Sequence, residues 1–258
     1  MSDIRTDHDF APLGFGFMRL PETECDGRTV FEHEKICAMV DEFMAAGFTY
    51  FDTAYGYHNG KSECELKAAL VDRYPRDSYT IATKLPAWLA DDANHARHMF
   101  DKSLEKLGIE YFDYYLLHNL GGPLTEPFEE YGLWEYVAEK REQGLIRHLG
   151  FSIHDKAEAL EEVLAKHADI KLDFVQLQIN YADWESTIIE SRKCYEVARA
   201  HGLPVVIMEP VKGGRPIFCM RRTRTHRWPR GRFASPRRCP ASWRCFRACP
   251  RSSRCAIT

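Results

Sequence analysis

The first 214 residues alternate short apolar segments with longer segments of helical periodicity. The short segments are rich in aromatic and β-branched residues and predict strands near 13–18, 48–51, 79–82, 112–117, 146–151, 174–179 and 203–208. Between them, apolar residues recur every three to four positions, which predicts helices over 32–46, 92–107, 127–143, 156–167 and 187–201. Four of these helices end at a glycine suited to a C-terminal cap: Gly47, Gly108, Gly144 and Gly202.

The order of these elements favours an α/β fold built from βα units. Strands that are apolar along most of their length, alternating with amphipathic helices, are typical of a parallel sheet covered by helices. Seven strands at intervals of roughly thirty residues favour an incomplete (β/α)8 barrel over an open doubly wound sheet. The open sheet is the alternative, but Gly14-Phe15-Gly16-Phe17 lacks the third glycine of a dinucleotide-binding turn. We therefore predict a barrel domain over residues 1–214.

The pattern stops at Gly213-Gly214, and residues 215–258 have a different composition. This tail holds thirteen arginines, five cysteines and several prolines, but no lysine, aspartate or glutamate. Three interpretations are open: a basic arm that binds nucleic acid, a disordered extension, or residues translated from a shifted reading frame of a GC-rich gene. The third is favoured, because a nucleic-acid arm would mix lysine with arginine and a disordered segment is poor in tryptophan and cysteine.

Charge and cysteine content exclude several classes for the first 214 residues. These residues carry 22 basic against 38 acidic side chains, so they offer no basic surface for nucleic-acid phosphates. No apolar run reaches the roughly 18 residues needed to span a bilayer, and the charged N-terminus lacks a secretory signal, so a cytoplasmic protein is expected. Their four cysteines are expected to be small buried residues, and no spacing indicates a metal site.

Ionisable side chains stand where three consecutive predicted strands end. The second strand closes on Asp52, with Tyr57 in the following loop, the third on Lys84 and the fourth on His118. The active sites of parallel barrels form at this edge. Each residue alone is more often a loop salt bridge or a satisfied core residue, but four such types on three consecutive strands point to catalysis.

These four side chains make chemical sense together. A tyrosine hydroxyl titrates near 10, and an adjacent lysine ammonium is expected to lower that pKa. Asp52 would hold Lys84 in place, and His118 could hydrogen-bond a substrate carbonyl oxygen. The set predicts a general acid that protonates an oxygen as hydride reaches the neighbouring carbon. With no catalytic metal indicated, the hydride is expected from a bound cofactor.

These motifs resemble those of the aldo-keto reductases. The similarity lies in Phe51-Asp52-Thr53-Ala54-x-x-Tyr57, Thr83-Lys84 and Leu117-His118, in the opening Leu13-Gly14-Phe15-Gly16, and in Ile146-Arg147-x-x-Gly150-Phe151-Ser152. It covers residues 12–214. The segments 151–154 and 208–214 look most like the bacterial and archaeal branch, whose members commonly carry a C-terminal ferredoxin-like domain with a 4Fe–4S cluster.

The resemblance implies a carbonyl reductase that uses NADP(H) to reduce an aldehyde or ketone. By carry-over, Tyr57 is the proton donor, Lys84 and Asp52 tune it, and His118 orients the carbonyl. Cofactor-binding positions are expected at Ser152, Gln176, Gly16 and Lys212, and no metal is implied. Most of the family has asparagine where this chain has Ile153, which removes one amide contact. Trp88 is expected either to wall an apolar substrate pocket or to pack against a helix.

The tail departs from the family. No eighth strand and no segment that grips the cofactor's adenosine phosphate can be recognised in 215–258, so the first and seventh strands are expected to have open edges. A truncated barrel of this kind predicts low stability, weak cofactor binding and loss of activity. Two other functions remain: a non-catalytic cofactor-binding regulator on the same fold, and a nucleic-acid binder through the tail.

Overall fold

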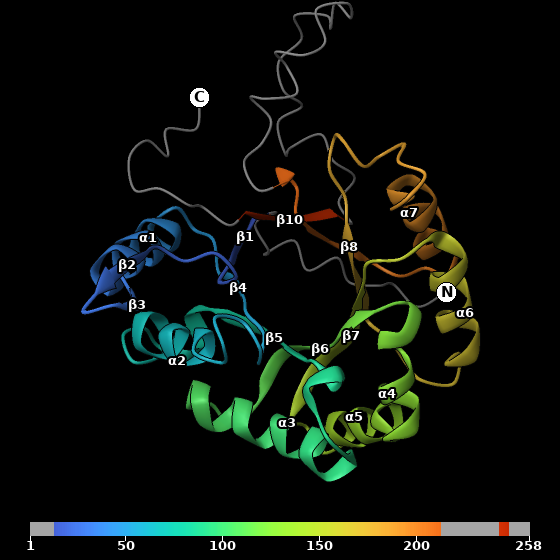
Figure 1. The fold of residues 1–258 in the computed structure, drawn as a ribbon, viewed down its shortest axis with the longest axis horizontal. Helices are drawn as coiled ribbons and strands as arrows, with labels where there is room; N and C mark the ends of the chain where they lie inside the picture. The colour runs from blue at the N-terminus through green and yellow to red at the C-terminus, as the bar shows by residue number, and fades with distance from the viewer. Residues whose placement is uncertain (1–12, 213–242, 248–258) are drawn as a thin grey trace, which may run out of the picture.

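Eight parallel strands form a closed barrel in the computed structural model, which describes residues 13–212 and the backbone of 243–247. Around the ring they follow the order β1, β10, β9, β8, β7, β6, β5, β4. Their bounds are β1 Leu13–Gly16, β4 Tyr50–Asp52, β5 Thr80–Leu85, β6 Phe112–Leu120, β7 Ile146–Ile153, β8 Phe174–Gln178, β9 Val205–Met208 and β10 Trp243–Arg247. Figure 1 looks into the barrel, with the helices arranged around its outside.

Seven of the eight strands are those that the sequence predicts, so the (β/α)8 barrel is confirmed, and among the described residues it is incomplete in its helices rather than in its strands. Each is followed by a helical segment up to β8, and within the described residues no helix follows β9 or β10. The helices are α1 His33–Ala45, α2 Ser62–Leu66, α3 Ala93–Leu107, α4 Glu126–Glu130, α5 Leu133–Glu142, α6 Ala157–Lys166 and α7 Ser191–Ala200. Single turns of 3₁₀-helix lie at Arg76–Ser78, Ala87–Leu89 and Gly122–Leu124.

The expectation of open edges on the first and seventh strands is wrong. β10 comes from the arginine-rich tail, and its backbone pairs with β1 on one side and β9 on the other. Backbone pairing depends little on side-chain identity, so an unusual composition does not prevent a segment from filling the eighth place. The predicted boundary at residue 214 and the rest of the tail lie outside the described residues.

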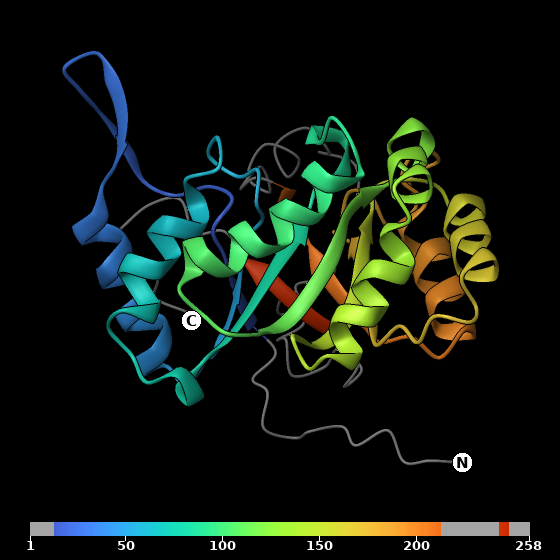
Figure 2. The same cartoon turned by 90° about the horizontal axis from the view of Figure 1, so that it is seen from below.

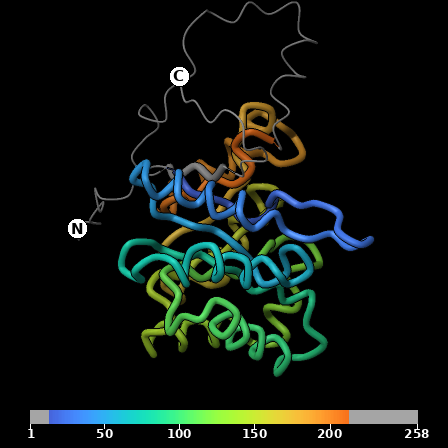
Figure 3. Tube along the Cα trace, turned by 90° about the vertical axis from the view of Figure 1, so that its left-hand side faces the viewer, coloured from blue at the N-terminus to red at the C-terminus, as the bar shows by residue number. Residues whose placement is uncertain are grey.

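Besides β10, two larger elements were not recognised in the sequence. A hairpin of β2 (Glu22–Cys25) and β3 (Arg28–Phe31) projects away from the barrel, as Figures 2 and 3 show in blue. Asp26 and Gly27 form its turn with positive φ angles of 51° and 71°, as a two-residue hairpin requires. The second is α2 with its continuation as a π-helix over Lys67–Val71.

The core has two parts. The larger one lies between the strands and the helices and includes Phe51, Ile81, Leu117 and Phe151. A smaller cluster lies on the inner faces of the strands and consists of Tyr50, Ala82, Tyr114, Leu116, Phe174 and Val206. Cysteine burial was predicted wrongly, because only Cys194 is buried, whereas Cys25 and Cys64 are exposed and Cys37 is half-buried.

Candidate active site

The inner face of the barrel turns from apolar to polar at the carboxyl ends of the strands. Because successive side chains alternate between faces, the residue two positions after an inner residue is again an inner one. Two positions beyond Tyr50, Ala82, Leu116 and Phe174 come Asp52, Lys84, His118 and Gln176. The strand ends of a parallel barrel share one edge, so these four polar side chains meet there above the apolar cluster.

Lys84 is the centre of this polar group. Its side chain is 1% exposed, and its ammonium donates to Asp52 Oδ1 at 2.6 Å, the Thr53 carbonyl at 2.7 Å and the Tyr57 hydroxyl at 3.2 Å. An ammonium has three protons, so all of them have a partner. Asp52, Tyr57 and Lys84, predicted from two separate segments, therefore meet in one hydrogen-bonded group.

The loop between β4 and α2 holds Tyr57 by its backbone. The Tyr57 amide donates to the Ala54 carbonyl at 3.1 Å, and the Tyr57 carbonyl accepts from the amides of Gly60 and Ser62. The Ser62 hydroxyl lies 2.9 Å from the Thr53 hydroxyl and donates to the Phe17 carbonyl at 3.0 Å. These contacts join the loop to β1 and β4, which fixes the phenol relative to Lys84.

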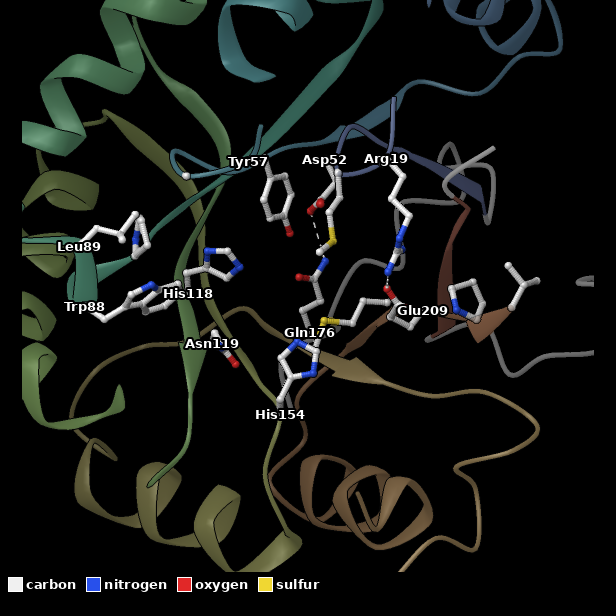
Figure 4. Close-up of a pocket in the computed structure, with 17 residues that line it drawn as sticks. Arg19, Asp52, Tyr57, Trp88, Leu89, His118, Asn119, His154, Gln176 and Glu209 are labelled. Carbon is white, nitrogen blue, oxygen red and sulfur yellow. Dashed lines mark hydrogen bonds and ion pairs between the residues drawn. The ribbon is translucent and has the colours of Figure 1, made fainter. Parts of the chain in front are cut away.

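A pocket of about 500 Å³ opens over this group (Figure 4). Tyr57 and His118 form part of its wall, with ring centroids 5.5 Å apart. Trp88 and Leu89 line it beside Pro86, and the Trp88 ring lies 5.1 Å from the His118 ring. Trp88 thus occupies the pocket wall, the first of its two predicted places.

Burial dominates the electrostatics of the pocket. Burial lowers the pKa of His118 well below its ordinary value, and Lys84 and His154 lower it further, so His118 is neutral at pH 7. Burial also lowers the pKa of Lys84, but Asp52 and Tyr57 outweigh this, and the net shift is upward. For Asp52, burial raises the pKa more than Lys84 and Gln176 lower it.

The expected pKa shift of Tyr57 has the wrong sign. Lys84 acts in the predicted direction, since its charge lowers the pKa of the phenol. Burial acts in the opposite direction and is the larger effect, so the pKa of Tyr57 lies above 10. Tyr57 is therefore a fully protonated phenol at neutral pH.

The four predicted cofactor positions do not all reach the pocket. Gly16 and Gln176 line it, and Gln176 Nε2 donates to Asp52 Oδ2 at 3.2 Å. Ser152 pairs with Gln176 in the strand register and is buried, with its Oγ accepting from the Asn119 amide at 2.8 Å. Lys212 does not line the pocket, and its ammonium binds the Asp183 carboxylate instead.

Four polar residues that line the pocket were not selected from the sequence: Arg19, Asn119, His154 and Glu209. Arg19, from the loop after β1, pairs with Glu209 at 2.5 Å beyond the end of β9. Asn119 has a positive φ of 57° and adjoins His118. His154 stands two positions after Ser152, a period-of-two signal that could have identified it.

Comparison with known proteins gives a consistent family. The sequence model described as "Aldo/keto reductase family" matches residues 12–229. A methylglyoxal reductase of Escherichia coli O157:H7 is 33% identical over 137 residues, which cover 50% of this chain and 46% of the relative. A D-galacturonate reductase of Fragaria ananassa is 30% identical over 195 residues, covering 69% of this chain and 58% of the relative. The chain thus spans about half the length of these curated relatives.

Solved structures share the fold. A thermostable aldo-keto reductase crystallised with the inhibitor epalrestat is 26% identical with a TM-score of 0.63, covering 80% of this chain and 70% of that one. An aldo-keto reductase from Klebsiella pneumoniae, in complex with NADPH, is 23% identical with a TM-score of 0.61 and coverages of 81% and 66%. Over residues 13–212, no cluster of His, Cys, Asp and Glu suits a metal ion. No helix in the same range is long and apolar enough to cross a membrane.

Proposed function

Because this chain belongs to the aldo/keto reductase family, we propose that it is an NADP(H)-dependent reductase of aldehydes or ketones, with Tyr57 as the general acid. The observation that carries the proposal is the contact of Lys84 with both Asp52, at 2.6 Å, and the Tyr57 hydroxyl, at 3.2 Å, beneath the pocket. Family relatives named as reductases, and a neighbour crystallised with NADPH, support the cofactor assignment.

Gln176, which lines the pocket, and Ser152, which is buried beside it in the strand register, fit the nicotinamide carboxamide of the cofactor. The Ser152 hydroxyl accepts from the Asn119 amide, so its own proton is available to a carbonyl oxygen. The amide nitrogen of Gln176 is engaged by Asp52, which leaves the Gln176 oxygen as an acceptor for the carboxamide N–H. When bound, NADPH would supply the hydride.

The protein's own residues would supply the proton and the orientation. Tyr57 donates its hydroxyl proton to the carbonyl oxygen as hydride adds to the carbonyl carbon, which yields the alcohol and leaves a phenolate. Lys84, charged and 3.2 Å from that oxygen, stabilises the phenolate. His118 is neutral, and its buried Nδ1 has no hydrogen-bond partner among the described residues, so it can orient the carbonyl by a hydrogen bond without competing as an acid.

The composition of the tail, residues 215–258, affects the expected affinity for the cofactor. The resemblance places the segment that grips the adenosine phosphate after the seventh strand, and residues 215–258 contain no recognisable counterpart. We therefore expect weak binding of NADPH and low turnover, in keeping with a tail from a shifted reading frame. The first 214 residues are acidic and give no support to nucleic-acid binding, and a small-molecule carbonyl compound is the proposed substrate.

The test is NADPH oxidation by the purified full chain with a panel of small aldehydes, at high cofactor concentration. Tyr57→Phe is expected to reduce kcat about 10²–10⁴-fold, as loss of a general acid does. Tyr131→Phe, a tyrosine that does not line the pocket, is the matched control. An unchanged rate in Tyr57→Phe would refute the assigned role. NADPH binding without turnover in the wild type would favour the regulatory alternative.

A further inference from the structure

A chain of hydrogen bonds runs from the loop after β8 to the pocket through Gln178. Gln178 Nε2 donates to Asp183 Oδ2 at 2.7 Å. Asp183 is buried, and although burial raises its pKa, hydrogen bonds from Lys212, Asn180 and Gln178 hold it below its usual value. Asp183 is therefore a carboxylate, which accepts hydrogen bonds only, and the amide nitrogen of Gln178 must face it.

This arrangement fixes the tautomer of His154. The amide oxygen of Gln178 faces the other way and lies 3.0 Å from His154 Nδ1. An amide oxygen only accepts, so Nδ1 carries the proton of the imidazole. Burial lowers the pKa of His154, so the ring is neutral at pH 7 and Nε2 holds a lone pair.

The lone pair of His154 faces the pocket. His154 lines the pocket together with Gln176 and Tyr57, and Figure 4 shows its ring pointing toward Gln176. Among the described residues, none forms a hydrogen bond with His154 Nε2. The neighbouring Ile153 is buried and apolar, and it pairs with Leu177 in the sheet. The position at which most of the family has asparagine therefore contributes no polar group here.

We propose that His154 Nε2 accepts a hydrogen bond from the carboxamide N–H of the nicotinamide ring, in place of the amide contact that Ile153 cannot make. This inference rests on the proposed function. A carboxamide offers one oxygen and two N–H donors. Two acceptors that match the N–H donors line the pocket, Gln176 Oε1 and His154 Nε2. The matching donor is the hydroxyl of Ser152, which is buried beside Gln176 in the strand register. Gln178 and Asp183 are then positioning residues, which act on the cofactor only through His154.

The discriminating experiment compares NADP⁺ with its 3-acetylpyridine analogue, in which a methyl group replaces the carboxamide nitrogen. Both Kd values are measured by calorimetry on the full chain. In the wild type, NADP⁺ binds more tightly than the analogue. In His154→Phe, which keeps a ring but no acceptor, the ratio of the two Kd values is expected to shrink about tenfold, the value of one hydrogen bond. The analogue's own Kd should change little.

His98→Ala, an exposed histidine of α3, is the matched control and should leave both Kd values unchanged. An unaltered Kd ratio in His154→Phe would overturn the role of His154 alone. Failure of the wild type to bind NADP⁺ at all would overturn the proposed function and this inference together.

A second measurement needs no cofactor. Nitrogen-15 NMR of the free chain, with the His154 signals assigned by their loss in His154→Phe, should show Nδ1 protonated and Nε2 bare. In Gln178→Leu, which removes the partner of Nδ1, the ring should become a mixture of the two tautomers. A wild-type His154 protonated at Nε2 would contradict the proposal, since that nitrogen could not then accept.

Discussion

Replacing Lys84 with methionine tests whether the buried ion pair determines the stability of the barrel. The Lys84 and Asp52 side chains are 1% and 9% exposed and 2.6 Å apart, so each is the main counter-charge of the other. Removing one partner leaves the other buried and uncompensated, which costs about 3–5 kcal/mol. That is a large part of the roughly 5–15 kcal/mol by which domains are stable.

The assay is urea unfolding followed by circular dichroism for Lys84→Met, Asp52→Asn and the double variant. With a denaturant slope of about 2 kcal/mol per molar, each single change should lower the midpoint by about 2 M. The double variant leaves no buried charge behind, so its loss should be smaller than the sum of the single losses. Lys166→Met removes a surface partner of Glu129 and should cost less than about 1 kcal/mol.

The pH dependence of the Lys84→Met variant gives an independent check. Burial already raises the pKa of Asp52, and loss of Lys84 removes the charge that opposes this. The folded form then binds a proton at a pH where the unfolded chain has released it. The loss of stability caused by Lys84→Met is thus greatest above the pKa of Asp52 in the folded variant. It decreases as the pH falls toward about 3.9, the pKa of an aspartate in the unfolded chain. Single losses that add up to the double loss within about 0.5 kcal/mol would refute the coupling.

Three further predictions concern pH and packing. Burial lowers the pKa of His118, so the unfolded chain binds protons first and stability should fall as pH drops below about 6.5; His118→Gln should flatten that slope, by up to about 1.4 kcal/mol per pH unit, in urea titrations from pH 7 to 5. Because the pKa of Tyr57 is raised, the reduction rate should stay level through neutral pH and fall only above about pH 10, while alcohol oxidation rises; a decline centred near pH 7 in the kcat/KM profile would contradict this. A methyl group on Gly150 would lie 2.5 Å from the Phe174 carbonyl oxygen, so Gly150→Ala should cost about 1–3 kcal/mol or more in thermal melts. Gly16→Ala should not, because no atom of the described residues lies within 4 Å of the added methyl group.

The sequence predicted what short-range periodicity determines. The spacing of apolar residues predicts buried strands such as 112–117 and amphipathic helices such as 92–107. Polar residues at the strand ends indicate the edge of a parallel barrel at which the active site forms. The helical segment 62–71 was not predicted although Leu66 and Leu70 have helical spacing, because its α-helix changes to a π-helix after Leu66. The hairpin was missed although Asp26-Gly27 is a strong turn signal, because β2 and β3 are exposed and carry no apolar alternation.

The sequence could not predict quantities that depend on three-dimensional balance. Lys84 lowers the pKa of Tyr57 and burial raises it. Burial is the larger effect because the folded structure encloses the Tyr57 side chain, and this enclosure cannot be judged from the sequence. The same holds for His154, whose tautomer follows from which atom of Gln178 faces Asp183, five residues further along the chain. Residue types at strand ends therefore predict which groups can take part in catalysis. The protonation state of each group is determined by hydrogen bonds between different loops. For this reason, which atoms of the proposed carboxamide site donate hydrogen bonds and which accept them can be determined only from the folded barrel.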